Sequence, residues 1–136
     1  MSSGIVELPE LLRSLSPRWN PSVYVFVSVP EGTQVNLRRA IASIREPEGW
    51  SLVMAEADAI ALGLPIGFRA AWLTLTVHSA LEAVGLTAVV AQALADAGIS
   101  CNVVAGAHHD HLFVPCERAQ DAMTVLAGLQ RRAAGA

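Results

Sequence analysis

The sequence Trp72-Leu-Thr-Leu-Thr-Val-His-Ser begins the stretch that decides the fold, and this stretch extends to Pro115. Leu73, Leu75 and Val77 alternate with the tryptophan and two threonines. A period of two is the spacing that a pleated strand gives to residues on one face. The stretch therefore begins with a predicted strand.

A change of period predicts a helix after this strand. From Leu86 onward the apolar residues are three or four positions apart, which places them on one stripe of a helix. The residues of this stripe are Leu86, Val89, Val90, Ala93, Leu94 and Ala97. Gly98 ends the predicted helix, because glycine adopts the left-handed conformation of a helix end at little steric cost.

Two further strands are predicted beyond this glycine. In residues 99–105, Ile99, Cys101, Val103 and Ala105 alternate with Ser100, Asn102 and Val104, and residues 106–111 are polar and turn-like. Residues 112–114 are apolar and precede a proline, as at the end of a short strand. The predicted order is strand, helix, strand, hairpin and strand.

Three runs within this stretch resemble the ACT domain. They are Leu81-Glu-Ala-Val-Gly-Leu-Thr-Ala, Ala97-Gly-Ile-Ser-Cys-Asn-Val-Val-Ala-Gly and His109-Asp-His-Leu-Phe-Val-Pro. More narrowly, the chain resembles the small tandem ACT-like proteins of bacteria, whose domain type also occurs in aspartate kinases and in animal cytosolic arginine sensors. The resemblance implies an α+β fold, a ferredoxin-like βαββαβ antiparallel sheet with helices on one face. It also implies a small ligand, usually an amino acid, at the loop between the first strand and first helix.

Composition narrows the class of protein. Hydrophobic residues make up 53% of the chain and charged residues 15%, so we expect a packed core and some apolar surface that meets a partner. A net charge of -3, with nine Lys and Arg residues scattered along the chain, argues against nucleic acid as a partner. Charged residues interrupt every apolar run short of the roughly 18 residues of a membrane helix. No signal peptide and no disulfide framework are visible, which predicts a cytoplasmic protein.

The N-terminal half contains too few elements for a self-sufficient domain. They are a helix over 7–15, a strand over 23–29 with a central position in a sheet, a helix or a loop with one helical turn over 34–45, a strand over 50–54 and a helix over 55–62.

The C-terminal half lacks the last strand of the βαββαβ pattern. After residue 114 comes a helix with Ala122, Met123 and Leu126 on one face, and no closing strand follows it. We therefore expect N-terminal strands to complete the sheet. The predicted organisation is an incomplete ACT-like subdomain over residues 1–66 and a fuller ACT domain over residues 67–136.

The loop from His78 to Thr87 is the predicted ligand site. A helix start offers unpaired backbone N–H groups and a positive dipole end, which suit a carboxylate. Gly85 permits close approach, Ser79 and Thr87 supply hydroxyls, and by resemblance Gly85 matches the loop glycine of the family. The alternative is that Gly85 only relaxes a turn and Thr87 only caps the helix.

The run His108-His-Asp-His is open to several interpretations. Three imidazoles and a carboxylate can bind zinc or transfer protons, although neighbours in a strand point to opposite faces. A second interpretation is a polar hairpin whose histidines lie on the surface. We favour a third interpretation, in which His109, Asp110 and His111 line the same pocket or interface as the loop at Gly85.

These considerations predict a non-catalytic regulatory module without a cofactor or metal. The predicted ligand is an amino acid, and unmatched sheet edges predict a homodimer. The predicted ligand-binding residues are His78, Ser79, Glu82, Val84, Gly85, Leu86, Thr87, Asn102, His109, Asp110 and His111.

Two alternatives to this function remain. One is a protein-interaction module in which Leu81 and Val84 fill the loop in place of a ligand. The other is a metal-dependent hydrolase at His108 to His111.

Overall fold

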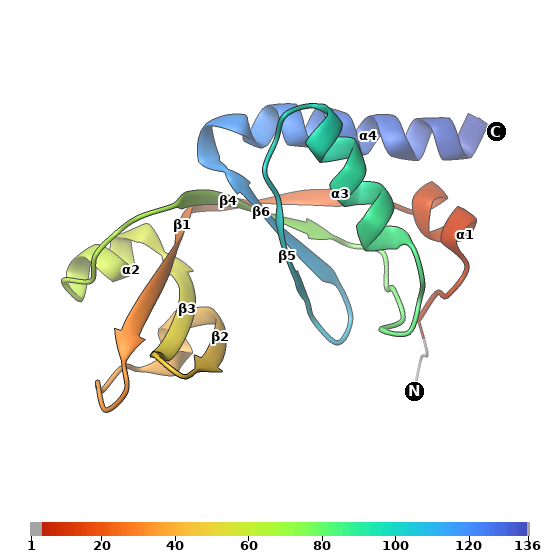
Figure 1. The fold of residues 1–136 in the computed structure, drawn as a ribbon. Coiled ribbons are helices and arrows are strands. Elements are labelled where there is room, and N and C mark those ends of the chain that lie inside the picture. Colours follow the sequence, from red (N-terminus) through yellow and green to blue (C-terminus); the bar gives the residue numbers. More distant parts are fainter. Residues whose placement is uncertain (1–3, 136) are drawn as a thin grey trace. The chain divides into compact units, whose positions relative to one another are not determined.

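The computed structural model describes residues 4–135 and divides the chain into two compact units. The larger unit comprises the described parts of Met1–Asn20 and Ala71–Ala136, and the smaller unit comprises Pro21–Ala70. The chain therefore leaves the larger unit after Asn20, inside its first strand, and returns to it at Ala71 (Figure 1).

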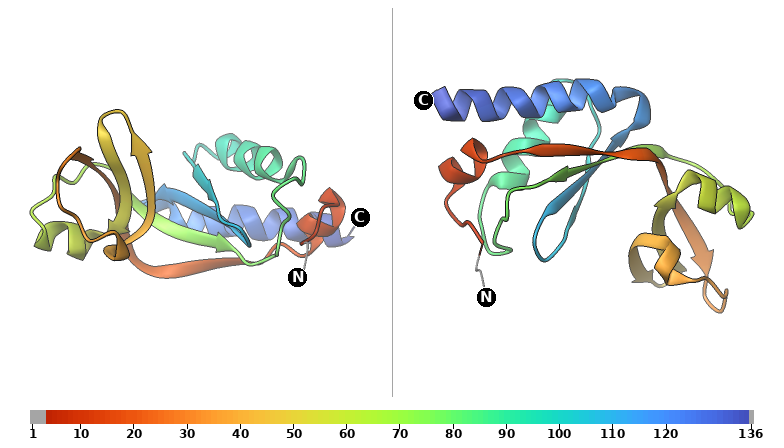
Figure 2. Two further views of the ribbon diagram at one scale, coloured as in Figure 1. Left: turned by 90° about the horizontal axis from the view of Figure 1, so that it is seen from below. Right: turned by 180° about the vertical axis from the view of Figure 1, so that it is seen from behind.

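The larger unit is a sheet with helices on one face. Its elements are α1 (Leu8–Arg13), the first part of β1 (Pro17–Pro30), β4 (Arg69–Leu75), α3 (Leu86–Asp96), β5 (Asn102–Ala105), β6 (Asp110–Pro115) and α4 (Ala119–Gly135). Hydrogen bonds join its strands in the order β1-β4-β6-β5. Both views of Figure 2 show β1 running beside β4.

The pairing of β1 with β4 confirms that an N-terminal strand completes the C-terminal sheet. The backbone N–H of Thr76 donates to the carbonyl of Ser16 at 2.9 Å, and the hydroxyl of Thr76 donates to the same oxygen. Asn20, a buried polar residue, donates through Nδ2 to the carbonyl of Trp72 and to Thr74 Oγ1. Side chains as well as backbone therefore hold the two strands together.

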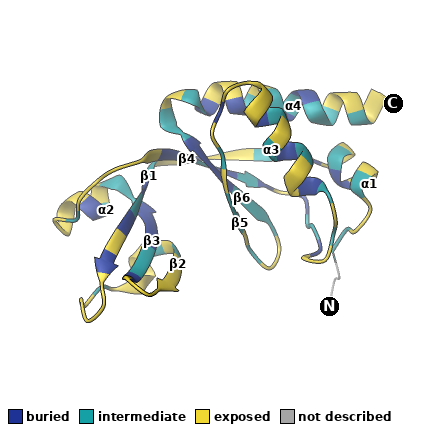
Figure 3. Cartoon of the chain, in the orientation of Figure 1, coloured by how far each residue is buried: buried dark blue, intermediate teal, exposed yellow. Residues whose placement is uncertain are grey.

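The core of the larger unit lies between the sheet and three helices. Strands supply Leu73, Leu75, Leu112 and Val114, and the helices supply Leu11, Leu86, Val90, Leu94, Ala122 and Leu126. The buried members of the predicted patterns include Leu73 and Leu75 of β4 and Leu86, Val90 and Leu94 of α3, and Figure 3 shows the buried faces of these elements.

The smaller unit is a three-stranded antiparallel arrangement with one helix. It contains β2 (Ala40–Glu46), β3 (Gly49–Ala55), α2 (Glu56–Ala61) and the second part of β1, with β3 between β2 and β1. The register of β1 on β3 runs from Tyr24↔Ala55 to Pro30↔Gly49. Its small core consists of Val25, Val27, Val29, Leu52, Met54 and Ala59.

The helix predicted over residues 34–45 is wrong, and the alternative of a loop with one helical turn fits residues 34–39 only. The structure has a 3-10 turn at Leu37–Arg39 followed by strand β2. The helical spacing of the apolar residues in this range does not record a buried face. Ile44 is 56% exposed, and β2 lies at the edge of the sheet. β2 gains its structure from hydrogen bonds to β3, a tertiary contact that the local pattern does not encode.

Other boundaries differ in small ways. β5 begins at Asn102 and not at Ile99, while β6 begins at Asp110 and not at Leu112. The predicted strand over residues 23–29 is the second part of β1, and its register pairs Tyr24 to Pro30 with β3. Among the described residues, no helix has both the length and the apolar character needed to cross a membrane.

The position of α1 in the core of the larger unit generates a stability prediction. Leu11 is 0% exposed, and its replacement by alanine should lower the free energy of unfolding by about 2–5 kcal/mol through lost burial and a cavity. The matched control is Leu62→Ala, because Leu62 is 49% exposed and should change the same quantity by less than about 0.5 kcal/mol. Urea unfolding followed by far-UV circular dichroism measures both, and equal losses would contradict the packing of α1.

Candidate functional site

A pocket of about 150 Å³ lies in the larger unit between the loop after β4, the first turn of α3 and the β5–β6 hairpin. Its lining is Ser79, Ala80, Leu81, Ala83, Gly85, Leu86, Thr87, Ala105 and Asp110. The structure thus brings together five of the predicted site residues, Ser79, Gly85, Leu86, Thr87 and Asp110.

Gly85 sets the direction in which the chain enters α3. Its φ of +106° is disfavoured for residues with a side chain, and a Cβ added there would lie 3.1 Å from Leu8 Cδ2 of α1. Glycine is therefore required by the backbone conformation and by the close approach of α1. Substitution here would disturb the fold together with any ligand site.

The first turn of α3 presents backbone donors to the pocket. Gly85 is the N-cap residue, and no side chain caps the helix. The N–H groups of Leu86 and Thr87 belong to the first turn, which has no partners within a helix. This turn also contains no acidic residue, so the positive end of the helix dipole is not neutralised locally.

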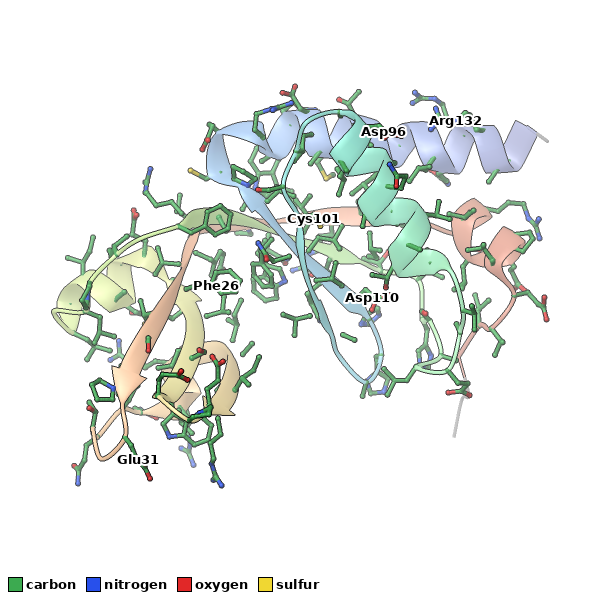
Figure 4. The ribbon with its side chains drawn as sticks, in the orientation of Figure 1. Phe26, Glu31, Asp96, Cys101, Asp110 and Arg132 are labelled. Atoms are coloured by element: carbon green, nitrogen blue, oxygen red, sulfur yellow. The ribbon has the colours of Figure 1, made fainter. Side chains whose placement is uncertain are left out.

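Asp110 provides a carboxylate opposite these donors. It is the first residue of β6, and Figure 4 shows its side chain beside the start of α3. Burial raises the pKa of Asp110 above its ordinary value, an effect that His111 and His109 partly oppose. No hydrogen bond or ion pair to another described residue satisfies this half-buried carboxylate, and such a group usually has a partner.

Two hydroxyl side chains border the same pocket. Ser79 makes only a long contact of 3.3 Å with the carbonyl of Ala80, and Thr87 is exposed. Both hydroxyls can donate to or accept from a small polar ligand. The pocket therefore combines backbone donors, hydroxyls and one carboxylate.

The apolar residues of the loop do not fill the pocket. Leu81 is 67% exposed and Val84 is 82% exposed. The interaction-module alternative required these two side chains to occupy the space beside Gly85. Their exposure leaves the pocket open and places two apolar groups on the adjacent surface.

The other predicted site residues do not line the pocket. Glu82 and Asn102 are exposed, and the lining of the pocket does not include His78, Val84, His109 or His111. The grouping of Asp110 with the Gly85 loop follows our favoured interpretation of the histidine run. That interpretation also placed His109 and His111 in the pocket, and neither residue lines it.

His111 is a partner of β4. Its Nδ1 accepts a hydrogen bond of 3.0 Å from the indole N–H of Trp72 and lies 3.2 Å from Thr74 Oγ1. An acceptor Nδ1 places the proton of the neutral ring on Nε2. Burial lowers the pKa of His111. The neighbouring His109 lowers this pKa further, and Asp110 partly opposes the effect.

A second hollow, which sequence reasoning missed, lies between α3 and α4. This groove of about 820 Å³ is lined by alanines, valines, a leucine and a glycine together with Gln92, Asp96, Thr124, Arg131 and Arg132, and Figure 4 labels Asp96 and Arg132. The pocket at Asp110 is the candidate functional site, because it brings together five of the predicted residues and places a half-buried carboxylate beside the uncapped start of α3.

Comparison with known proteins gives two family matches. The ACT domain matches over residues 3–71 and again over residues 68–128. A search of curated proteins gives no match.

Solved structures match over most of the chain. A Vibrio cholerae protein of unknown function, described as a possible transport protein, is 45% identical, with coverage of 90% of this chain and 95% of its own and a TM-score of 0.81. An Agrobacterium tumefaciens protein is 17% identical, with coverage of 85% of this chain and 89% of its own and a TM-score of 0.68. The regulatory subunit of aspartate kinase from Thermus thermophilus is 9% identical, with coverage of 85% of this chain and 98% of its own and a TM-score of 0.56. The last two likenesses concern the fold alone.

The environment of His111 generates a prediction about pH. Because its folded-state pKa is lowered, its contribution to stability is fully present above its ordinary pKa of 6.5 and is lost as the pH falls toward the lowered value. His111→Asn keeps an acceptor near the position of Nδ1 but does not titrate. We expect the variant to lose less thermal stability than the wild type between about pH 7.5 and pH 5.5. Equal losses, measured by calorimetry, would contradict this role.

Proposed function

Since the chain belongs to the ACT domain family, with two ACT domains in tandem, we propose that it is a non-catalytic regulatory module that binds a free amino acid in the pocket at Asp110. The observation that carries the proposal is the unpaired carboxylate of Asp110 opposite the uncapped start of α3. An amino acid carries a cation and an anion at adjacent positions. Its ammonium group fits Asp110, and its carboxylate fits the backbone donors.

The size of the pocket supports a ligand of this class. Its volume of about 150 Å³ is below the roughly 300–1,000 Å³ of pockets for drug-sized ligands. A nucleotide would exceed this space, whereas a small amino acid fits with its side chain toward the open rim. Ser79 and Thr87 favour a polar ligand over a hydrocarbon.

Ligand binding would act by a shift between packing arrangements. The pocket is built from three segments, the loop after β4, the first turn of α3 and the β5–β6 hairpin. A ligand that contacts all three favours the arrangement in which they are closest. The exposed Leu81 and Val84 beside the pocket suit a second copy of the chain, so the proposed active form is a homodimer.

The thiols are consistent with a reducing compartment. Cys101 is a free thiol, and burial raises its pKa to about 11. A thiol with this pKa is protonated at neutral pH and is a poor nucleophile. The proposed location is the cytoplasm.

The Asp110→Asn variant tests the ligand. We expect thermal unfolding with each of the twenty amino acids to reveal a stabilising ligand for the wild type. A ligand at 100 times its Kd adds about 2.7 kcal/mol to the free energy of unfolding, which is a shift of a few degrees. Calorimetric titration of that ligand should then show binding to Asp110→Asn that is at least about tenfold weaker, since a charge-assisted hydrogen bond is lost.

The same variant should not be less stable without ligand at neutral pH. Because burial raises the pKa of Asp110, its charge costs stability once the pH exceeds the raised pKa, and asparagine removes this cost. Weaker binding with unchanged or higher stability separates recognition from folding. Asp96→Asn, at the far end of α3, is the matched control that should bind normally. The absence of a shift with every amino acid would overturn the proposal in favour of an interaction module.

The exposed loop generates a prediction about assembly. Val84 is 82% exposed, so Val84→Asp should leave the fold of each chain intact while it breaks an apolar contact between copies. Light scattering after size exclusion should give a dimer for the wild type and a monomer for this variant. Ile60→Asp is the matched control, because Ile60 is 62% exposed and lies on α2 of the smaller unit. A wild-type monomer, or a dimer that survives Val84→Asp, would contradict the proposed interface.

A further inference from the structure

Three histidines that are separated in sequence lie together in the larger unit. The ring centroid of His78, in the loop after β4, is 5.2 Å from that of His108 and 6.4 Å from that of His109. The rings of His108 and His109 are 6.3 Å apart, because the hairpin bends at these residues. We call His78, His108 and His109 the histidine trio.

The imidazoles of the trio are not hydrogen-bonded in the described part of the chain, although His109 interacts electrostatically with Asp110 and His111. No hydrogen bond or ion pair to another described side chain or backbone group engages them. His108 is exposed, and the other two are partly exposed, so water and ions reach the rings. His111 differs in both respects, since it lies in β6 and accepts from Trp72.

The spacing of the rings is close to that of ligands on one metal ion. With a Zn–N distance of about 2.0–2.1 Å and a tetrahedral angle, the centroids of two ligating imidazoles are about 5 Å apart. The pair His78 and His108 has this separation at 5.2 Å. The other two pairs must close by about 1 Å to bind the same ion.

No group of three His, Cys, Asp or Glu side chains among residues 4–135 is already arranged to hold a metal ion, so closure is a required step. The backbone favours a small adjustment. His78 is fixed by its carbonyl, which accepts from the N–H of Ile5 at 2.8 Å, and the N–H of Ala80 donates to Ile5. His108 and His109 lie at the bend of the hairpin, where His108 is exposed and His109 is partly exposed, so neither ring is locked in a packed core.

We propose that the histidine trio is a binding site for one divalent transition-metal ion, with zinc as the probe. Three neutral imidazoles are a common ligand set for Zn²⁺, and a fourth position remains for water. The chain neighbours Ser79 and Asp110 line the candidate pocket, so the ion would tie the two sides of that pocket together. The site does not depend on an amino acid as ligand, and its test is separate.

The test is zinc titration of the full-length chain, free of any affinity tag and stripped with a chelator. Calorimetry should show one Zn²⁺ per chain with a Kd in the micromolar range or below. Thermal unfolding should shift upward by a few degrees with zinc and return to its original value with excess chelator. Absorption of the Co²⁺ form should indicate nitrogen ligands without a thiolate charge-transfer band.

Four single variants assign the ligands. His78→Ala and His108→Ala should each weaken zinc binding at least about tenfold while circular dichroism stays unchanged. His111→Asn is the matched control, since it removes a histidine of the same run that lies outside the trio. Cys116→Ser excludes the thiol as a ligand and should bind normally.

Three outcomes would overturn the site. They are no binding of zinc to the wild type at millimolar concentration, normal binding by His78→Ala, and equal loss in His111→Asn or Cys116→Ser. The variant His78→Ala is decisive, because the loop histidine is what distinguishes the trio from the adjacent pair in the hairpin.

Discussion

The hydrogen bonding of β1 to β4 is the constraint on which the larger unit depends. The segment from β4 to α4 has only three strands, so without β1 the outer edge of β4 would expose unpaired N–H and C=O groups. The same N-terminal segment brings Leu11 and Leu15 into the core with α3 and α4. Both the sheet and its helical layer therefore require residues that lie 50 or more positions earlier in the chain.

This arrangement also fixes the candidate site. The N-terminal segment reaches Gly85 through Leu8, and it reaches His78 through the backbone of Ile5. The loop after β4 is thus held from the side opposite the hairpin. A loop held in this way presents the first turn of α3 and the side chain of Asp110 to one small space, without needing side chains to fill it. A preorganised site of this kind loses less conformational entropy when a ligand binds.

The sequence predicts most of the fold because periodicity records burial. Leu73 and Leu75 face the core as predicted, and Gly98 has the expected positive φ of +72°. Of the predicted stripe of α3, Leu86, Val90 and Leu94 are in the core, whereas Val89, Ala93 and Ala97 line the groove between α3 and α4. β2 was missed because its structure comes from pairing with β3 and its residues are mostly exposed. The pocket was predicted in part, since Gly85 and Asp110 both carry local signals. No local sequence signal indicates the proposed role of His78, because only the tertiary structure brings this residue to the hairpin.

The run His108-His-Asp-His shows how one boundary divides the roles of neighbouring residues. β6 begins at Asp110, so the two histidines before it follow the bend and the histidine after it follows the pleat of the strand. The pleat directs His111 to Trp72, where burial and an indole donor keep it neutral. The bend removes the alternation that would separate His108 from His109, and both turn toward His78. Asp110 stands at the boundary, and its carboxylate faces the pocket and the start of α3. A four-residue motif thereby contributes to three environments, which explains why its composition alone does not assign it to one.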